Sequence, residues 1–114
     1  MHELSLIASL FEILEEKAAE QGAKRILSVK LQVGRLSGAI PELLKTSFDI
    51  YKKDTIAAEA ELETIDVPFK VECNVCHTQM IKDDLVAICD ECGSMDLKTL
   101  QGTDLYLLKM DVEI

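Results

Sequence analysis

Two short pairs of cysteines constrain the fold of this chain more than any other feature. The pairs are Cys73-Asn-Val-Cys76 and Cys89-Asp-Glu-Cys92, and twelve residues separate them. With two residues between the cysteines of a pair, both sulfurs can point inward from one tight turn, which we call a knuckle. The segment between the pairs is long enough for a hairpin that brings the two knuckles face to face. Four thiolates in a tetrahedron form a closed structural zinc site, so the spacing predicts Zn(II). Disulfides and an iron–sulfur cluster are the alternatives.

Composition limits the class of protein. The chain has 114 residues, of which 48% are hydrophobic, enough for a packed core in one ordinary domain or two very small ones. No run of eighteen apolar residues predicts a membrane span, and the start of the chain lacks the basic region of a signal peptide. We therefore expect a cytoplasmic protein, in which paired cysteines are better interpreted as metal ligands than as disulfides.

The charge balance argues against a nucleic-acid partner. The net charge is −9, and residues 69–102 carry three lysines against six acidic residues. The excess of acidic residues disfavours contacts with phosphates. Phe69 is the only aromatic residue in that segment, so stacking of several bases is not expected either.

The periodicity of apolar residues predicts two helices in the first half of the chain. One covers residues 3–21, and its inner face is the set Ile7, Leu10, Phe11, Leu14 and Ala18. The other covers residues 41–53, with Pro41 in its first turn and an inner stripe of Leu44, Phe48 and Tyr51.

Three segments with alternating polarity predict strands. Residues 26–33 place Leu27, Val29, Leu31 and Val33 on one side. Residues 58–67 form a second strand that Pro68 ends. Residues from Leu108 to Ile114 form the last, in which Leu108, Met110, Val112 and Ile114 alternate with charged residues. This last strand has no core of its own, so it should return to the first sheet. The predicted fold class is α+β, with two helices on a small three-stranded sheet formed by residues 1–67 plus 103–114. A zinc-ribbon-like domain is inserted at residues 68–102. Hinges are expected near Pro68 and Gly102. An insert of this size needs metal to hold it together.

The first three residues form a second candidate metal site. Met1 should be retained, because the initiator methionine is removed mainly before small residues. The Met1 amine, the His2 amide nitrogen and the His2 imidazole then close adjacent chelate rings, and Glu3 supplies its amide or carboxylate. Such a nitrogen-rich, near-planar set favours Ni(II) or Cu(II). On chemistry alone, an exposed histidine without a function is the alternative.

Several motifs in combination resemble the HypA/HybF family of nickel metallochaperones. They are Met1-His2-Glu3-Leu4-Ser5, Val33-Gly34 followed by Leu36-Ser37, Pro41-Glu42 and the two cysteine pairs. The resemblance covers essentially the whole chain in the right order. It implies nickel binding at His2 with Glu3, zinc at the four cysteines, and delivery of nickel to the precursor of the nickel–iron hydrogenase large subunit together with the GTPase HypB. A monomer and a homodimer are both compatible with it.

One position departs from part of that family. Some members carry histidines beside both cysteine pairs and adjust zinc ligation with them. Here His77 follows Cys76, but Gly93 follows Cys92. A two-histidine switch is therefore not available. A one-histidine version that uses His77 is one interpretation, and an exposed His77 near the metal is the simpler one.

Other classes of protein find less support. An enzyme would need a catalytic constellation, yet the only histidines are His2 and His77, and all four cysteines are assigned to metal. A zinc-ribbon nucleic-acid binder is the best rival from another class, and the acidic insert opposes it. A structural adaptor differs only in whether His2 binds metal.

Overall fold

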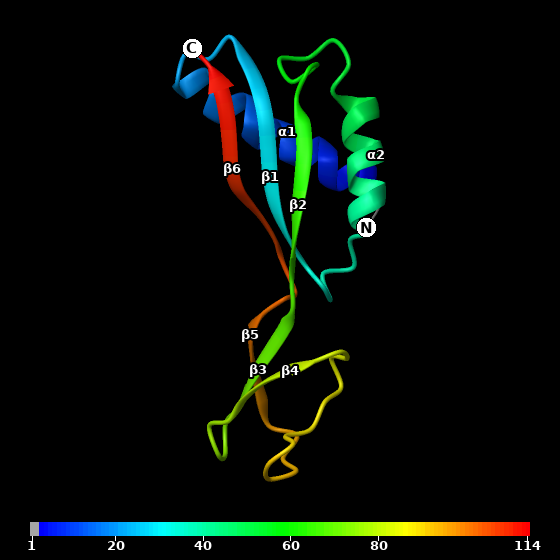
Figure 1. Ribbon diagram of the computed structural model, residues 1–114, viewed down its shortest axis with the longest axis vertical. Coiled ribbons are helices and arrows are strands. Elements are labelled where there is room, and N and C mark those ends of the chain that lie inside the picture. The colour runs from blue at the N-terminus through cyan, green and yellow to red at the C-terminus, as the bar shows by residue number, and fades with distance from the viewer. Residues whose placement is uncertain (1–2) are drawn as a thin grey trace.

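The protein consists of two three-stranded sheets arranged end to end, with both helices on the first (Figure 1). The computed structural model describes residues 3–114, which extend over 54 × 25 × 17 Å. In chain order the elements are α1 (Glu3–Glu20), β1 (Arg25–Gly34), α2 (Pro41–Tyr51), β2 (Glu61–Val67), β3 (Phe69–Cys73), β4 (Gln79–Lys82), β5 (Leu97–Gln101) and β6 (Leu105–Glu113). The α+β class and the return of the last strand to the first sheet are confirmed.

The two helices pack on one another and on the first sheet. All five apolar residues predicted for the inner face of α1 are buried. Helix α1 crosses behind the sheet, and α2 lies beside it next to β2 (Figure 1). The ring of Phe11 lies 5.3 Å from that of Phe48 and 4.8 Å from that of Tyr51, so one aromatic cluster joins the helices.

The first sheet has the strand order β2-β1-β6. Strand β1 pairs in parallel with β2 and antiparallel with β6. Its last residues therefore meet both flanking strands, since Gly34 is opposite Val67 of β2 and Val33 is opposite Leu105 of β6. This end of the sheet is where the chain leaves for the cysteine segment and returns from it.

Two β-bulges between β1 and β6 correct the predicted side-chain faces of these two strands. The register between β1 and β6 slips between Ile26 and Ser28, so Leu27 is an extra residue; it is 46% exposed, and Ile26 is buried in its place. A second slip between Lys30 and Leu31 leaves Leu108 without an opposite residue and 49% exposed. Each bulge reverses the alternation of side chains. The predictions that Leu27 shares a side with Val29 and that Leu108 shares a side with Met110 were wrong for this reason.

The connections between the sheets are fixed by main-chain hydrogen bonds. The loop after β1 receives both connections: Gly34 N–H donates to Asp104 O (2.9 Å), Arg35 N–H to Val67 O (2.8 Å) and Leu36 N–H to Gly102 O (2.8 Å). A Cβ added at Gly34 would lie 2.5 Å from the carbonyl carbon of Gly102. This close approach requires glycine at position 34. A Cβ added at Gly102 would instead lie 2.5 Å from Phe69 Cα, so glycine at position 102 permits a second close approach, to the start of β3.

No helix among residues 3–114 is long and apolar enough to cross a membrane.

Candidate metal centre

The second sheet holds the cysteines and has little apolar core. Its strand order is β4-β3-β5, with both pairings antiparallel. The buried side chains of this part of the chain are Phe69, Val71, Cys73 and Cys89. None of them belongs to the apolar cluster between α1, α2 and the first sheet. Burying two large apolar side chains contributes only about 3–6 kcal/mol, so a bound metal is the main source of stability that this sheet can have.

The two knuckles have the same backbone structure. In the first, the amides of Val75 and Cys76 both donate to Cys73 Sγ at 3.4 Å, and His77 N–H donates to Cys73 O at 2.9 Å. In the second, the amides of Glu91 and Cys92 donate to Cys89 Sγ at 3.4 and 3.5 Å, and Gly93 N–H donates to Cys89 O at 3.0 Å. Amides aimed at sulfur stabilise the thiolate form, which is the form that binds metal.

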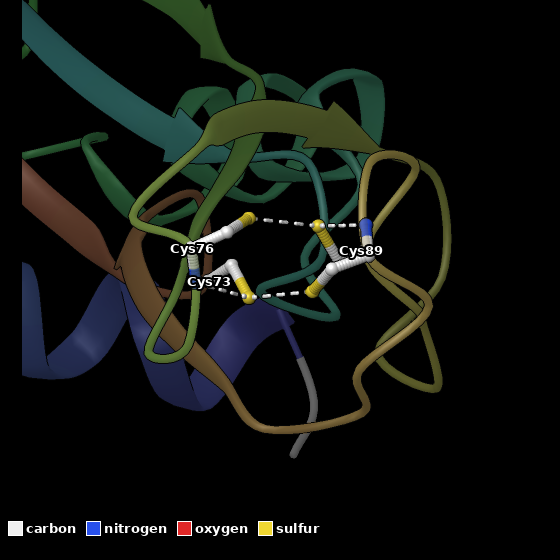
Figure 2. Close-up of side chains that lie close together, drawn as sticks. Cys73, Cys76 and Cys89 are labelled. Atoms are coloured by element: carbon white, nitrogen blue, oxygen red, sulfur yellow. Dashed lines mark hydrogen bonds between the residues drawn. The ribbon is translucent and has the colours of Figure 1, made fainter.

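The four sulfurs form one compact group. Cys73 Sγ lies 3.6 Å from Cys92 Sγ, and Cys76 Sγ lies 3.5 Å from Cys89 Sγ. All four sulfurs lie within 4.8 Å of one another. Figure 2 shows the sulfur of Cys76 pointing across to Cys89. Disulfide sulfurs would be about 2.05 Å apart, and all four cysteines are free. Four sulfurs about 2.3 Å from a single tetrahedral ion would be about 3.8 Å apart, close to the separations found.

The thiols of this group differ in how readily they lose a proton. Hydrogen bonds from the Thr78 side chain and backbone lower the pKa of Cys76 to about 6. The hydrogen bond from the Cys76 backbone lowers the pKa of Cys73. The pKa of Cys92 is raised to about 12. The backbone hydrogen bond from Ser94 alone would lower it, but the hydrogen bond with the Cys73 sulfur, burial and the other two sulfurs together outweigh that effect. Four thiolates in this space therefore require a positive ion.

Sequence reasoning missed two pairs of residues that support the site. Thr78 and Ser94 stand at the same offset after each pair, and their carbonyls accept hydrogen bonds from Cys73 N–H (2.9 Å) and Cys89 N–H (2.8 Å). Asn74 and Asp96 join the two knuckles, through Asn74 N–H to Asp96 O at 2.9 Å and the Asn74 amide to Asp96 Oδ1 at 3.0 Å. The repeated hydroxyl residue was visible in the sequence, whereas the Asn74–Asp96 contact was not.

The remaining predicted site residues are placed as follows. Met1 and His2 lie outside the described residues, and Glu3 is the first residue of α1. His77 is exposed at the turn of the first knuckle. The first turns of α1 lie beside the connection to the cysteine segment, because Leu6 lines a cavity of about 230 Å³ together with Gly38 and Asp104.

Comparison with known proteins decides the family. The family model described as hydrogenase/urease nickel incorporation metallochaperone, HypA, matches residues 1–112. The chain belongs to the HypA family. It is 34% identical over 114 residues to the hydrogenase maturation factor HypA of Aquifex aeolicus, with 100% of this chain and 99% of that protein covered. It is 36% identical over 107 residues to HypA of Moorella thermoacetica, with 94% and 95% covered.

Solved HypA structures share the fold. The solution structure of the nickel metallochaperone HypA from Helicobacter pylori matches with a TM-score of 0.74 and 26% identity, covering 99% of this chain and 98% of that one. A second HypA solution structure matches with a TM-score of 0.76 and 26% identity, covering 98% and 96%. HypA proteins are metallochaperones for hydrogenase maturation rather than enzymes. The family predicted from the motifs and the expected absence of an enzymatic role are both confirmed by these names.

Proposed function

We propose that this HypA-family protein binds one Ni(II) ion reversibly through Met1, His2 and Glu3 and delivers it to the precursor of the nickel–iron hydrogenase large subunit, with HypB as its partner. The nickel is cargo. The donors are the Met1 amine, the His2 amide and imidazole, and a group of Glu3. A chelate at a chain end can release its ligands one at a time to an acceptor. Membership of a nickel metallochaperone family is the observation that carries the proposal.

The same proposal gives Zn(II) to Cys73, Cys76, Cys89 and Cys92 as a structural ion. Its support is the sulfur geometry, with all four sulfurs within 4.8 Å of one another and none in a disulfide. Bound zinc would hold the knuckles together and leave no open coordination position for catalysis. Thiolates remain available as ligands in a reducing compartment, which agrees with a cytoplasmic location.

The decisive test is nickel titration of untagged protein by calorimetry, with zinc content measured in parallel. His2→Ala should abolish nickel binding and leave zinc at about one ion per chain. His77→Ala is the matched control, because it removes the only other histidine and should leave nickel affinity unchanged. Nickel affinity should fall as the pH drops through about 6.5, since protons compete for the imidazole.

Two results would contradict the proposal in different ways. Unchanged nickel affinity in His2→Ala would place the nickel site elsewhere in the chain. Nickel binding that fails to stimulate hydrogenase maturation in a reconstituted assay with HypB would instead favour a structural adaptor.

A further inference from the structure

The two knuckles are attached to the second sheet in different ways. The first is the turn of a hairpin, because Cys73 ends β3 and Gln79 begins β4. The second lies inside the long connection between β4 and β5, after residues 83–88. In the described part of the chain, the main chain of residues 83–88 forms no hydrogen bond with another segment, and the bond from Val86 N–H to Asp84 Oδ1 is local. The strands therefore hold the first knuckle directly and the second only at a distance.

Each knuckle is also tied to a neighbouring segment through the residue that follows its first cysteine. In the first knuckle, Asn74 bonds to Asp96, on the side where the chain leaves the second knuckle. In the second, Asp90 Oδ1 accepts a hydrogen bond from Lys82 Nζ at 2.5 Å. Lys82 is the last residue of β4. This ion pair therefore closes the connection of residues 83–88 and holds the side where the chain enters the second knuckle.

Lys82 belongs to the inner face of the second sheet. It lies opposite the buried Phe69 of β3. Its side chain is only 17% exposed, whereas Ile81, which points to the other face of β4, is 50% exposed. A lysine in such a place packs its carbon stem beside apolar neighbours and needs a partner for its ammonium group. Because Asp90 is that partner, Lys82 joins the small core of the sheet to the second knuckle.

We propose that the zinc site opens at its second knuckle, and that Lys82 is the positioning residue that keeps this knuckle closed through Asp90. The inference rests on the proposed binding of zinc by the four cysteines. It adds which half of the site releases the metal first: Cys89 and Cys92 detach while the β3–β4 hairpin still holds the other two cysteines.

The test measures the order in which the four cysteines become reactive. Zinc-loaded full-length protein is treated with a limiting amount of N-ethylmaleimide, and mass spectrometry gives the modified fraction of each cysteine. Cys89 and Cys92 should be modified before Cys73 and Cys76, because a thiolate reacts when it leaves the metal. In parallel, transfer of zinc to a chromophoric chelator gives the rate of metal release.

Matched lysine variants separate the contact with the knuckle from a general effect of charge. Lys82→Gln should speed both zinc release and modification of Cys89 by about two- to fivefold, as expected for the loss of one partly buried ion pair. Lys98→Gln is the control, because it removes the same charge from the same sheet and breaks the ion pair of Lys98 with Glu72, which joins β5 to β3. Its rates should equal those of wild type.

Two further variants show whether Lys82 acts through Asp90. Lys82→Arg keeps a cation in place and should restore the wild-type rates. In protein that already carries Asp90→Asn, the change Lys82→Gln should have no further effect, since the contact is already broken.

Three outcomes would overturn the inference. One is modification of Cys73 and Cys76 before the other two cysteines. Another is equal zinc release from Lys82→Gln and Lys98→Gln. The third is a full effect of Lys82→Gln in the Asp90→Asn protein. A wild-type protein that holds no zinc would instead refute the proposed zinc site, and the inference with it.

Discussion

His77 occupies in the first knuckle the place that Gly93 occupies in the second. Both residues have a positive φ, 64° and 75°, and both donate their amide to the carbonyl of the first cysteine of their pair. This backbone conformation costs an L-residue about 1–2 kcal/mol and costs glycine almost nothing. The first knuckle therefore contains backbone strain that the second avoids.

His77→Gly should strengthen zinc binding. Relief of the strain outweighs the extra chain entropy that glycine has in the unfolded state, about 0.4–1 kcal/mol, and leaves a gain of about 0.5–1 kcal/mol. This corresponds to a roughly two- to fivefold higher zinc affinity, measurable by competition with a chromophoric chelator. His77→Ala keeps the strain and is the control for the imidazole. A gain as large in the alanine variant would show that the side chain, not the backbone, is responsible.

Gly34→Ala should destabilise the junction of the two sheets by about 1–3 kcal/mol, because its Cβ would lie 2.5 Å from the carbonyl carbon of Gly102. Gly38→Ala is the matched control: its φ is 85°, but nothing lies within 4 Å of the added carbon. The two variants separate steric contact from backbone strain. Urea unfolding gives the free energies, and exchange of the Leu36 amide reports on the junction itself. A loss below about 0.5 kcal/mol in Gly34→Ala, with unchanged exchange of the Leu36 amide, would mean that the close approach contributes nothing.

The sequence predicted the helices and the metal cluster better than the strand faces. The helices are long and strongly periodic, so their inner faces followed directly from spacing. The cysteine pairs fix their own geometry. The predicted side-chain faces were wrong at Leu27 and Leu108, because one extra residue in a strand reverses the alternation of its side chains. Nothing in the local sequence indicates where a bulge lies. The second strand was predicted from residue 58 but begins at Glu61, since turns at residues 52–59 precede it. The positive φ of His77 could not be predicted either, because residues other than glycine rarely adopt it.

Ser28→Ala should reduce stability at neutral pH and not in acid. Ser28 Oγ donates to Asp111 Oδ2 at 2.7 Å, joining β1 to β6 beside the first bulge. This hydrogen bond is the main reason that the pKa of Asp111 lies below its ordinary value of 3.8. A depressed carboxylate pKa stabilises the fold above the unfolded-state value, and the contribution is lost as the pH falls through the folded-state value.

The measurement is the difference in unfolding free energy between wild type and Ser28→Ala at pH 7 and below about pH 3. The difference should be present at pH 7 and shrink in acid. In a double-mutant cycle, Ser28→Ala with Asp111→Ala should cost less than the two single changes added together. Additive losses would indicate that the two side chains act independently.

Removal of metal should unfold the second sheet and spare the first. The second sheet buries few apolar side chains, whereas a structural zinc site contributes about 10–16 kcal/mol. After chelation, NMR signals of residues 69–101 should collapse to unfolded positions, all four thiols should become open to alkylation, and the helical far-UV signal should persist. Zinc should restore the native spectrum. A second sheet that stays folded without metal would contradict this expectation.

The first sheet should fold without residues 68–102, which would support the predicted division of the chain. The apolar cluster of α1, α2 and the first sheet contains no residue of that segment. The nearest strand residues on either side of that segment, Val67 of β2 and Leu105 of β6, lie opposite consecutive residues of β1, Gly34 and Val33. Because β2 and β6 flank β1, the gap between them is two interstrand spacings, about 10 Å. A linker of four extended Gly/Ser residues spans about 13 Å and can therefore bridge it.

A chain with that linker in place of residues 68–102 should keep its helical signal, lose its zinc and, under the proposed function, bind Ni(II) through His2 with unchanged affinity. It should unfold at lower denaturant concentration than wild type, because Leu36 N–H loses its bond to Gly102 O. Amide exchange in β1 measures how much of the sheet survives. If the shortened chain were unfolded although the linker spans the gap, the two sheets would be one cooperative unit. The hydrogen bond from Leu36 N–H to Gly102 O would then be a contact that couples them.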